Sequence, residues 1–156
     1  MDTNQLYNIL SKNRIIKRYF LGVFAANEIP CNIYSVPCIF IANTDVSSEL
    51  GTHWVCIYID SNMQGYFFDS FGRSPCYYKH YHFSNFLDNN SNSWIYNTIQ
   101  LQSLQSSVCG QYCIAFAYYI CRGQSITKFL SYFTRNKLLN DIHIDSFVNE
   151  RICIYR

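Results

Sequence analysis

The sequence is poor in charged residues. Asp, Glu, Lys and Arg together make up 14% of its 156 residues, whereas an average globular domain has about 25%. The net charge of +2 excludes the strongly basic composition that is typical of a dedicated nucleic-acid-binding protein. We interpret the basic stretch at Lys12–Arg18 as a solvated helix end; a weak contact to an anion or to DNA is the alternative.

Long apolar runs are also missing. The longest runs, at 38–42 and 113–120, are far shorter than the ~20 residues that a membrane-spanning helix needs. The first ten residues lack the basic segment and the apolar segment of a secretory signal peptide. We therefore expect a protein that is not secreted, that has no membrane partner, and whose eight cysteines are reduced thiols.

Metal-binding cysteine pairs are absent as well, since no C-x-x-C pair occurs. Cys109 and Cys113 lie four residues apart, which would place them on one helix face, but no nearby His or Cys completes a set of four ligands. We expect no metal site, and buried free thiols as the usual state of the cysteines. For Cys109 two interpretations are open: a small apolar residue at the edge of a buried helix, or a nucleophile at the N-terminus of that helix.

The order of the predicted elements indicates one α+β domain over residues 1–156, without repeats or linkers. Short runs rich in Ile, Val and aromatic residues predict strands, and apolar residues three and four apart predict helices. We expect an extended segment at 19–30 and strands at 36–43, 52–60, 66–69 and 94–102. We expect a helix capped by Thr3, and helices at 80–90, from Cys109 to Arg122, at 125–133 with Ser125 as its cap, and at 140–152. A block of strands with flanking helices predicts a central mixed β-sheet covered by helices.

Two of these elements matter most for function. The strands at 52–60 and 66–69 look like a hairpin about a turn at Gln64–Gly65. The helix from Cys109 should end before Gly123, a residue type favoured just beyond a helix C-terminus.

A catalytic cysteine needs a lowered pKa, a base, an acceptor that orients the base, and donors for an oxyanion. Cys109 begins an apolar helix, where unpaired backbone N–H groups favour an anion. His53 lies on a predicted strand, and Asp69 lies near the end of the next one, so the hairpin can bring the two side chains together. Gln102 is predicted to end the strand that leads to Cys109, and its amide could donate to the same oxygen as the Cys109 backbone N–H.

Each of these residues also has a structural interpretation. His53 could be a satisfied core or surface histidine, and Asp69, before Ser70 and Gly72, could stabilise a turn. Gln102 could be a surface glutamine. Gln105 is a rival for its role.

Five stretches in this order resemble one family of cysteine proteases. They are YFLGVF from Tyr19, IANT from Ile41, GTHW from Gly51, YFFDSFG from Tyr66 and LQSLQSSVCGQYC from Leu101. The chain resembles, over residues 19–122, the adenain-like proteases of adenoviruses and Polinton/Maverick elements, which share a superfamily with the SUMO-specific proteases.

The resemblance implies a role for each matching position. Cys109 would be the nucleophile, His53 the base, Asp69 the orienting acid and Gln102 the oxyanion-hole donor, whereas Gln105 stands too close to Cys109. The resemblance also implies two substrate-binding residues. Trp54 would form a wall of a narrow cleft, and Gly110 would allow close approach at the helix start.

The family's activity implies a thiol endopeptidase that cuts virion precursor proteins, with glycine next to the cut bond. The implied location is the nucleus or cytoplasm of a host cell and the virion. Two alternatives are open: a deubiquitinase or deSUMOylase that acts on Gly-Gly tails, and a non-catalytic binding module that kept the fold.

The chain departs from the family at several points. Adenovirus members have Glu where this chain has Asp69; the SUMO-specific proteases have Asp. Adenovirus members also bind a viral peptide by a disulfide, but residues 89–102 contain no cysteine. We therefore expect no obligatory cofactor, and any peptide activator to bind non-covalently, near aromatic residues such as Trp94 and Tyr96. Adenovirus members use DNA as a cofactor and are strongly basic. The net charge of +2 gives little support to a DNA cofactor for this chain.

Overall fold

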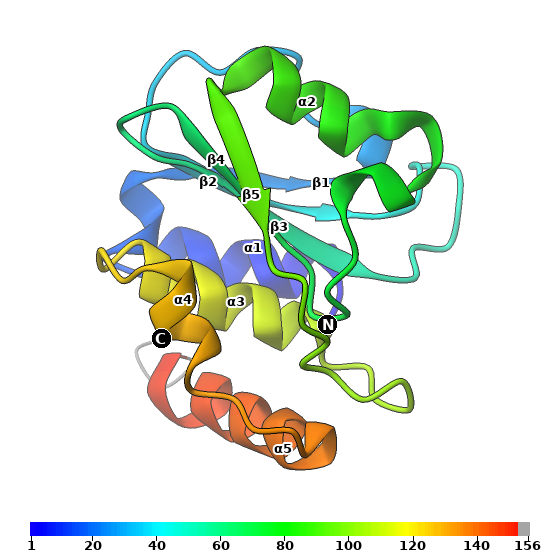
Figure 1. Ribbon diagram of the computed structural model, residues 1–156, viewed down its shortest axis with the longest axis vertical. Helices are drawn as coiled ribbons and strands as arrows, with labels where there is room; N and C mark the ends of the chain where they lie inside the picture. The colour runs from blue at the N-terminus through cyan, green and yellow to red at the C-terminus, as the bar shows by residue number, and fades with distance from the viewer. Residues whose placement is uncertain (153–156) are drawn as a thin grey trace.

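The computed structural model describes residues 1–152 and has an α+β fold with a five-stranded mixed sheet (Figure 1). The strand order is β1-β2-β3-β4-β5. The two outer pairs, β1 with β2 and β4 with β5, are parallel, and the two inner pairs are antiparallel. The strands are β1 (Phe20–Phe24), β2 (Cys38–Asn43), β3 (Trp54–Ile59), β4 (Gln64–Phe68) and β5 (Ser93–Tyr96).

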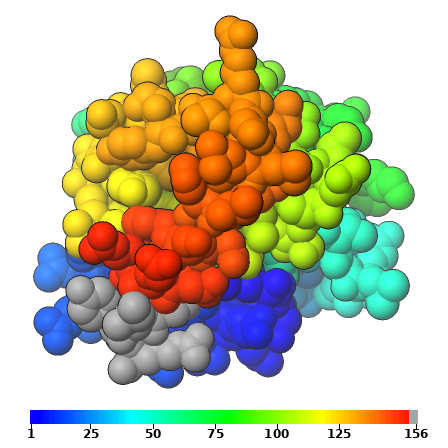
Figure 2. Space-filling view, turned by 90° about the horizontal axis from the view of Figure 1, so that it is seen from below, coloured from blue at the N-terminus to red at the C-terminus, as the bar shows by residue number. Residues whose placement is uncertain are grey.

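Helices cover both faces of the sheet. Helix α2 lies on one face, and α1 and α3 lie on the other, with α4 and α5 outside α3 (Figure 1). Seen from the side of α5, the orange and red residues of α4 and α5 cover much of this face of the molecule (Figure 2). The helices are α1 (Thr3–Lys12), α2 (His82–Asn90), α3 (Cys109–Ile120), α4 (Ile126–Leu130) and α5 (Lys137–Phe147). None of those in the described residues is long and apolar enough to cross a bilayer.

Side chains that alternate along the strands form two hydrophobic cores, one on each face of the sheet. Along β2, Ile39 and Ile41 join the core under α1 and α3, while Phe40, between them, joins the core under α2. Successive side chains of a strand point to opposite faces, so a strand covered on both faces must be apolar throughout. This is why β2 appears in the sequence as an uninterrupted apolar run.

Helix α3 is the most buried helix. Nine of its 12 residues are buried, because it packs on β3 and on the helices around it. The Phe68 ring, at the end of β4, stacks on Phe116 of α3 with 4.6 Å between ring centroids. Just beyond the C-terminus of α3, Gly123 has φ +81°, a conformation that glycine adopts without the penalty other residues incur. The packing of α3 holds its first turn close to the start of β3 and the end of β4.

The predicted hairpin is confirmed, but its predicted turn is wrong. Gln64 and Gly65 lie within β4, and the chain turns earlier, at residues 60–63. Asp60 closes the turn, because its carboxylate accepts from the backbone N–H groups of Asn62 and Gln64, each at 2.9 Å. A side chain that bonds to backbone two residues on outweighs the glycine signal here.

The predicted strand at 94–102 is too long. Strand β5 ends at Tyr96, because the next residue, Asn97, turns its side chain to the backbone of Asp69. The remaining residues, up to Gln102, form a loop. Gln102 therefore lies in a loop and does not end a strand.

Smaller differences occur at element ends. Asp2, not Thr3, caps α1: its carboxylate accepts from the Gln5 N–H, and the Gln5 side chain accepts from the Asp2 N–H. Ser125 caps α4 as predicted, and α5 begins three residues before the predicted position of 140, with Asn136 as its cap. Residues 153–156, the end of the predicted domain, lie outside the described part of the chain.

Candidate active site

The hairpin and the central helix bring three polar side chains together. His53 directly precedes β3 and Asp69 directly follows β4; the sequence had placed His53 within the strand. The antiparallel register pairs Cys56 with Phe68, so the end of β4 lies beside the start of β3. Cys109 is the first residue of α3, as predicted.

The three side chains form one buried cluster. His53 Nε2 lies 2.6 Å from Asp69 Oδ1, and both residues are buried. The Cys109 side chain lies close enough to His53 that each group shifts the pKa of the other. An imidazole held between a thiol and a carboxylate is the arrangement that activates a nucleophile.

The pKa values follow from this arrangement. Burial lowers the pKa of His53, but hydrogen bonds to Asp69 and Cys109 outweigh burial and raise the pKa to about 9. Burial raises the pKa of Cys109, but the hydrogen bond and positive charge of His53, with the backbone N–H groups of Trp54 and Gly110, bring it below its usual value. The pKa of Asp69 is lowered, since bonds from His53 and Tyr78 outweigh burial. The geometry favours a thiolate beside an imidazolium.

Four other cysteines of the described residues lack such partners. Burial raises the pKa of Cys38 to about 11 and that of Cys121 to about 12. The same cause places the pKa values of Cys56 and Cys113 well above the usual range. A thiol with a raised pKa is a poor nucleophile at neutral pH. All seven cysteines in the described residues are free thiols. The eighth, at position 153, lies outside them.

Asp69 is held from several sides. Its Oδ2 accepts from the Tyr78 hydroxyl at 2.7 Å, and its Oδ1 accepts from the Phe71 N–H at 2.9 Å. The Asn97 amide clamps the Asp69 backbone, accepting from its N–H at 2.9 Å and donating to its carbonyl at 2.6 Å. Tyr78 and Asn97 could not be found from the sequence, since neither stands in a recognisable pattern with Asp69.

Gln102 is buried and fixed at both ends of its amide. Its Oε1 accepts from the Ser70 hydroxyl at 2.6 Å, and its Nε2 donates to the Ser106 carbonyl at 2.9 Å. An amide nitrogen carries two hydrogens, so one N–H of Nε2 is still free to donate. Gln105, by contrast, is exposed.

Trp54 and Gly110 both meet the N-terminal segment. The half-buried Trp54 donates its indole N–H to the Met1 carbonyl at 3.0 Å. A Cβ added at Gly110 would lie 3.3 Å from both Leu6 and Met1, so the packing of α1 on α3 is one reason for a small residue here. The substrate contacts assigned to Trp54 and Gly110 stay predictions.

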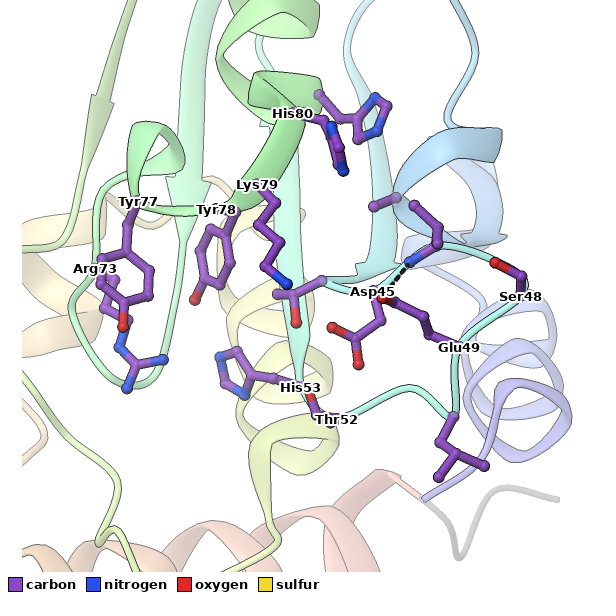
Figure 3. A pocket seen from close by; sticks show the side chains of 15 residues that line it. Asp45, Ser48, Glu49, Thr52, His53, Arg73, Tyr77, Tyr78, Lys79 and His80 are labelled. Carbon is purple, nitrogen blue, oxygen red and sulfur yellow. Dashed lines mark hydrogen bonds between the residues drawn. The ribbon is translucent and has the colours of Figure 1, made fainter.

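A pocket of about 850 Å³ opens beside His53 (Figure 3). Asp45 and Glu49 line it from the loop after β2, and Arg73 and Lys79 line it from the segment after β4. Within the described part of the chain, His53 and Asp69 form the only ion pair. Among the described residues, none of the four charged groups of the pocket is held in an ion pair.

The described residues contain no group of three or more His, Cys, Asp or Glu side chains that could hold a metal ion. What the arrangement can do is acyl transfer: it offers a thiolate, an acid–base imidazole and amide donors.

No family model matches the chain, and no curated protein matches it. Among solved structures, the selenomethionine form of the ASFV pS273R protease is similar over 69% of this chain, with 24% sequence identity and a TM-score of 0.44. This chain spans 44% of the length of that protein.

Proposed function

We propose that this protein is a cysteine endopeptidase of a virus or a virus-like mobile element. One observation carries the proposal: the buried cluster in which His53 lies between its hydrogen-bond partner Asp69 and Cys109, the first residue of α3. The lowered pKa of Cys109 supports an enzyme over a binding module that merely kept the fold, because such a module has no use for a thiolate.

In the proposed reaction the Cys109 thiolate attacks the carbonyl carbon of a peptide bond. The Cys109 backbone N–H and the free N–H of Gln102 stabilise the oxyanion of the tetrahedral intermediate. Protonated His53 then gives its proton to the leaving amine, and an acyl-enzyme forms. Water, deprotonated by His53, attacks the thioester and releases Cys109.

The proposed substrates are virion precursor proteins cut next to glycine, in a host cell or in the virion. This part rests on the resemblance of the five sequence stretches. The pocket beside His53 has room for substrate side chains, and its charged walls suit a polar protein segment. A deubiquitinase or deSUMOylase would use the same chemistry on a different substrate.

The test is a panel of fluorogenic substrates: ubiquitin, SUMO and short Gly-x-Gly peptides. We expect cleavage of the short peptides, and none by a Cys109→Ala variant. Cleavage restricted to ubiquitin or SUMO would favour the alternative. Stoichiometric binding of a substrate without any cleavage would favour a binding module.

The proposed enzyme needs no metal and no disulfide-linked peptide. Any peptide activator would add non-covalently, and β5 offers a place because it lies at the edge of the sheet, with Trp94 and Tyr96 partly accessible. Main-chain hydrogen bonds along a free strand edge are a common way to bind a peptide. We propose at most weak binding to nucleic acid, through the exposed basic side chains of Lys12–Arg18.

The pH dependence of kcat/KM should be bell-shaped. Activity rises as the pH passes upward through the lowered pKa of Cys109, because the thiolate forms there. It falls with a midpoint near pH 9, where His53 loses the proton that the leaving amine needs. The control is the iodoacetamide reaction of Cys109, which needs only the thiolate and should not decline above pH 9. If the decline in activity had its midpoint near pH 6.5 instead, the ion pair between His53 and the Cys109 thiolate would be contradicted.

Replacing Asp69 with asparagine should impair turnover and leave the fold intact. An amide can still bond the imidazole, but it no longer stabilises the imidazolium and can favour the wrong tautomer. The loss of kcat/KM should be smaller than for Cys109→Ala, because thiols need less activation than hydroxyls. The matched control is Asp88→Asn, which alters a carboxylate on α2 that accepts the indole N–H of Trp94. Unchanged kcat/KM in Asp69→Asn would show that another group orients His53.

Replacing Gln102 with alanine should lower kcat roughly 10²-fold, the usual effect of removing one oxyanion donor. Gln105→Ala is the control and should have little effect, since Gln105 is exposed. Single-turnover rates with one peptide substrate would compare the two variants. The reverse ranking would assign the oxyanion hole to Gln105.

A further inference from the structure

Ser70 connects the acid of the site to its oxyanion donor. It directly follows Asp69 and is fully buried. Its hydroxyl donates to Gln102 Oε1 at 2.6 Å. Its carbonyl accepts from the backbone N–H groups of Leu101 and Gln102, at 2.8 Å and 3.1 Å. Ser70 therefore holds Gln102 by the backbone and by the side chain.

The orientation of the Gln102 amide decides whether it can serve an oxyanion. A carboxamide has an acceptor at one end and donors at the other, and a half-turn exchanges them. In the observed orientation the Ser106 carbonyl accepts from Nε2, and the Ser70 hydroxyl donates to Oε1. After a half-turn, Oε1 would face the Ser106 carbonyl oxygen, and two acceptors would oppose each other.

Without the Ser70 hydroxyl, Oε1 of Gln102 would be buried and have no donor in this orientation. A buried acceptor without a donor costs free energy, which favours orientations that reach another donor. The amide would tilt, and the free N–H of Nε2 would no longer have a fixed direction.

We propose that Ser70 is a positioning residue that orients the Gln102 amide, so that one N–H of Nε2 faces the developing oxyanion. The proposal rests on the endopeptidase function proposed above. The consecutive residues Asp69 and Ser70 then have separate tasks. Asp69 orients the imidazole, and Ser70 orients the oxyanion donor.

The kinetic test is a double-mutant cycle of Ser70→Ala with Gln102→Ala. Ser70→Ala should lower kcat about 10-fold, a part of the roughly 10²-fold loss expected without Gln102, and should change KM little. In the Gln102→Ala background it should cause no further loss, because the group that it positions is gone. An equal loss in both backgrounds would overturn the proposal.

A second readout separates positioning of Gln102 from damage to the rest of the site. Alkylation of Cys109 by iodoacetamide forms no oxyanion, so Ser70→Ala should leave its rate and pH dependence unchanged. A shift in either would mean that Ser70 acts through Asp69 and His53 instead. Ser84→Ala is the matched control: it also removes a buried hydroxyl, one that donates to the Tyr81 carbonyl on the α2 side of the sheet. It should leave kcat unchanged.

A third measurement is independent of peptidase activity. The side-chain amide protons of Gln102 can be assigned by NMR, because their signals are absent from Gln102→Ala. Ser70→Ala should shift these signals. Ser70→Cys keeps a weaker S–H donor and should shift them less, and this variant replaces Ser70→Ala if the alanine variant does not fold. If wild-type protein cleaves no peptide, the function proposed above fails, and the NMR shifts still decide whether Ser70 orients Gln102. Unshifted signals in both variants would overturn the inference.

Discussion

Replacing Cys109 with alanine should abolish peptide cleavage, with a loss in kcat of roughly 10⁵-fold or more, the order seen when a hydrolase loses its nucleophile. The methyl group of alanine cannot form the thioester, and water alone must attack the peptide bond. The fold should persist, since Cys109 lies at the first turn of α3 and the packing of the helix rests on residues further along. Circular dichroism and thermal unfolding would check this beside the assay.

The controls come from the other cysteines. Cys113→Ala removes a buried thiol one helical turn further along α3, with a raised pKa, and Cys76→Ala removes an exposed one. Neither should lower kcat substantially. In wild-type protein, brief treatment with iodoacetamide at neutral pH should label Cys109 first, as mass mapping would show. Labelling of Cys76 or Cys31 while Cys109 stays unmodified would contradict the central assignment.

Replacing His53 with alanine should have the next largest effect, a loss in kcat of roughly 10⁴-fold, the upper end for general acid–base catalysis. Two contributions disappear together. The thiolate loses the imidazolium that stabilises it, so the pKa of Cys109 should rise. The leaving amine also loses its proton donor.

The two contributions can be separated by experiment. The pH profile of the iodoacetamide reaction reports the Cys109 pKa alone, and it should shift upward in His53→Ala. The peptidase assay reports both contributions. His143→Ala is the control, because His143 is an exposed histidine on α5. An unshifted alkylation profile in His53→Ala would show that the helix start alone lowers the Cys109 pKa.

Local patterns were enough to predict much of the fold. Burial on two sides can be seen directly in the sequence. It explains both the apolar run of β2 and the change to helical spacing at Cys109. The hairpin also placed His53 near Asp69, because its two strands are adjacent in the chain.

Contacts between distant segments could not be predicted in the same way. The side chains of Asn97 and Ser70 bond to groups 28 and 32 residues away, and no periodicity records such a pairing. The same contacts explain the error at 94–102. Apolar spacing favoured a strand there, but Asn97 ends β5 by binding the backbone of Asp69. The residues after Asn97 form a loop beside the site and no longer pair with the sheet.

The N-terminal segment carries none of the four proposed catalytic residues, yet it lies against two of their chain neighbours. Met1 accepts the Trp54 indole N–H, and Leu6 and Met1 fill the space beside Gly110. The layer that packs on the first turn of α3 therefore also supports the backbone N–H of Gly110, which helps to stabilise the Cys109 thiolate. Docking of the N-terminal segment on α3 and the reactivity of the thiol are thermodynamically coupled for this reason.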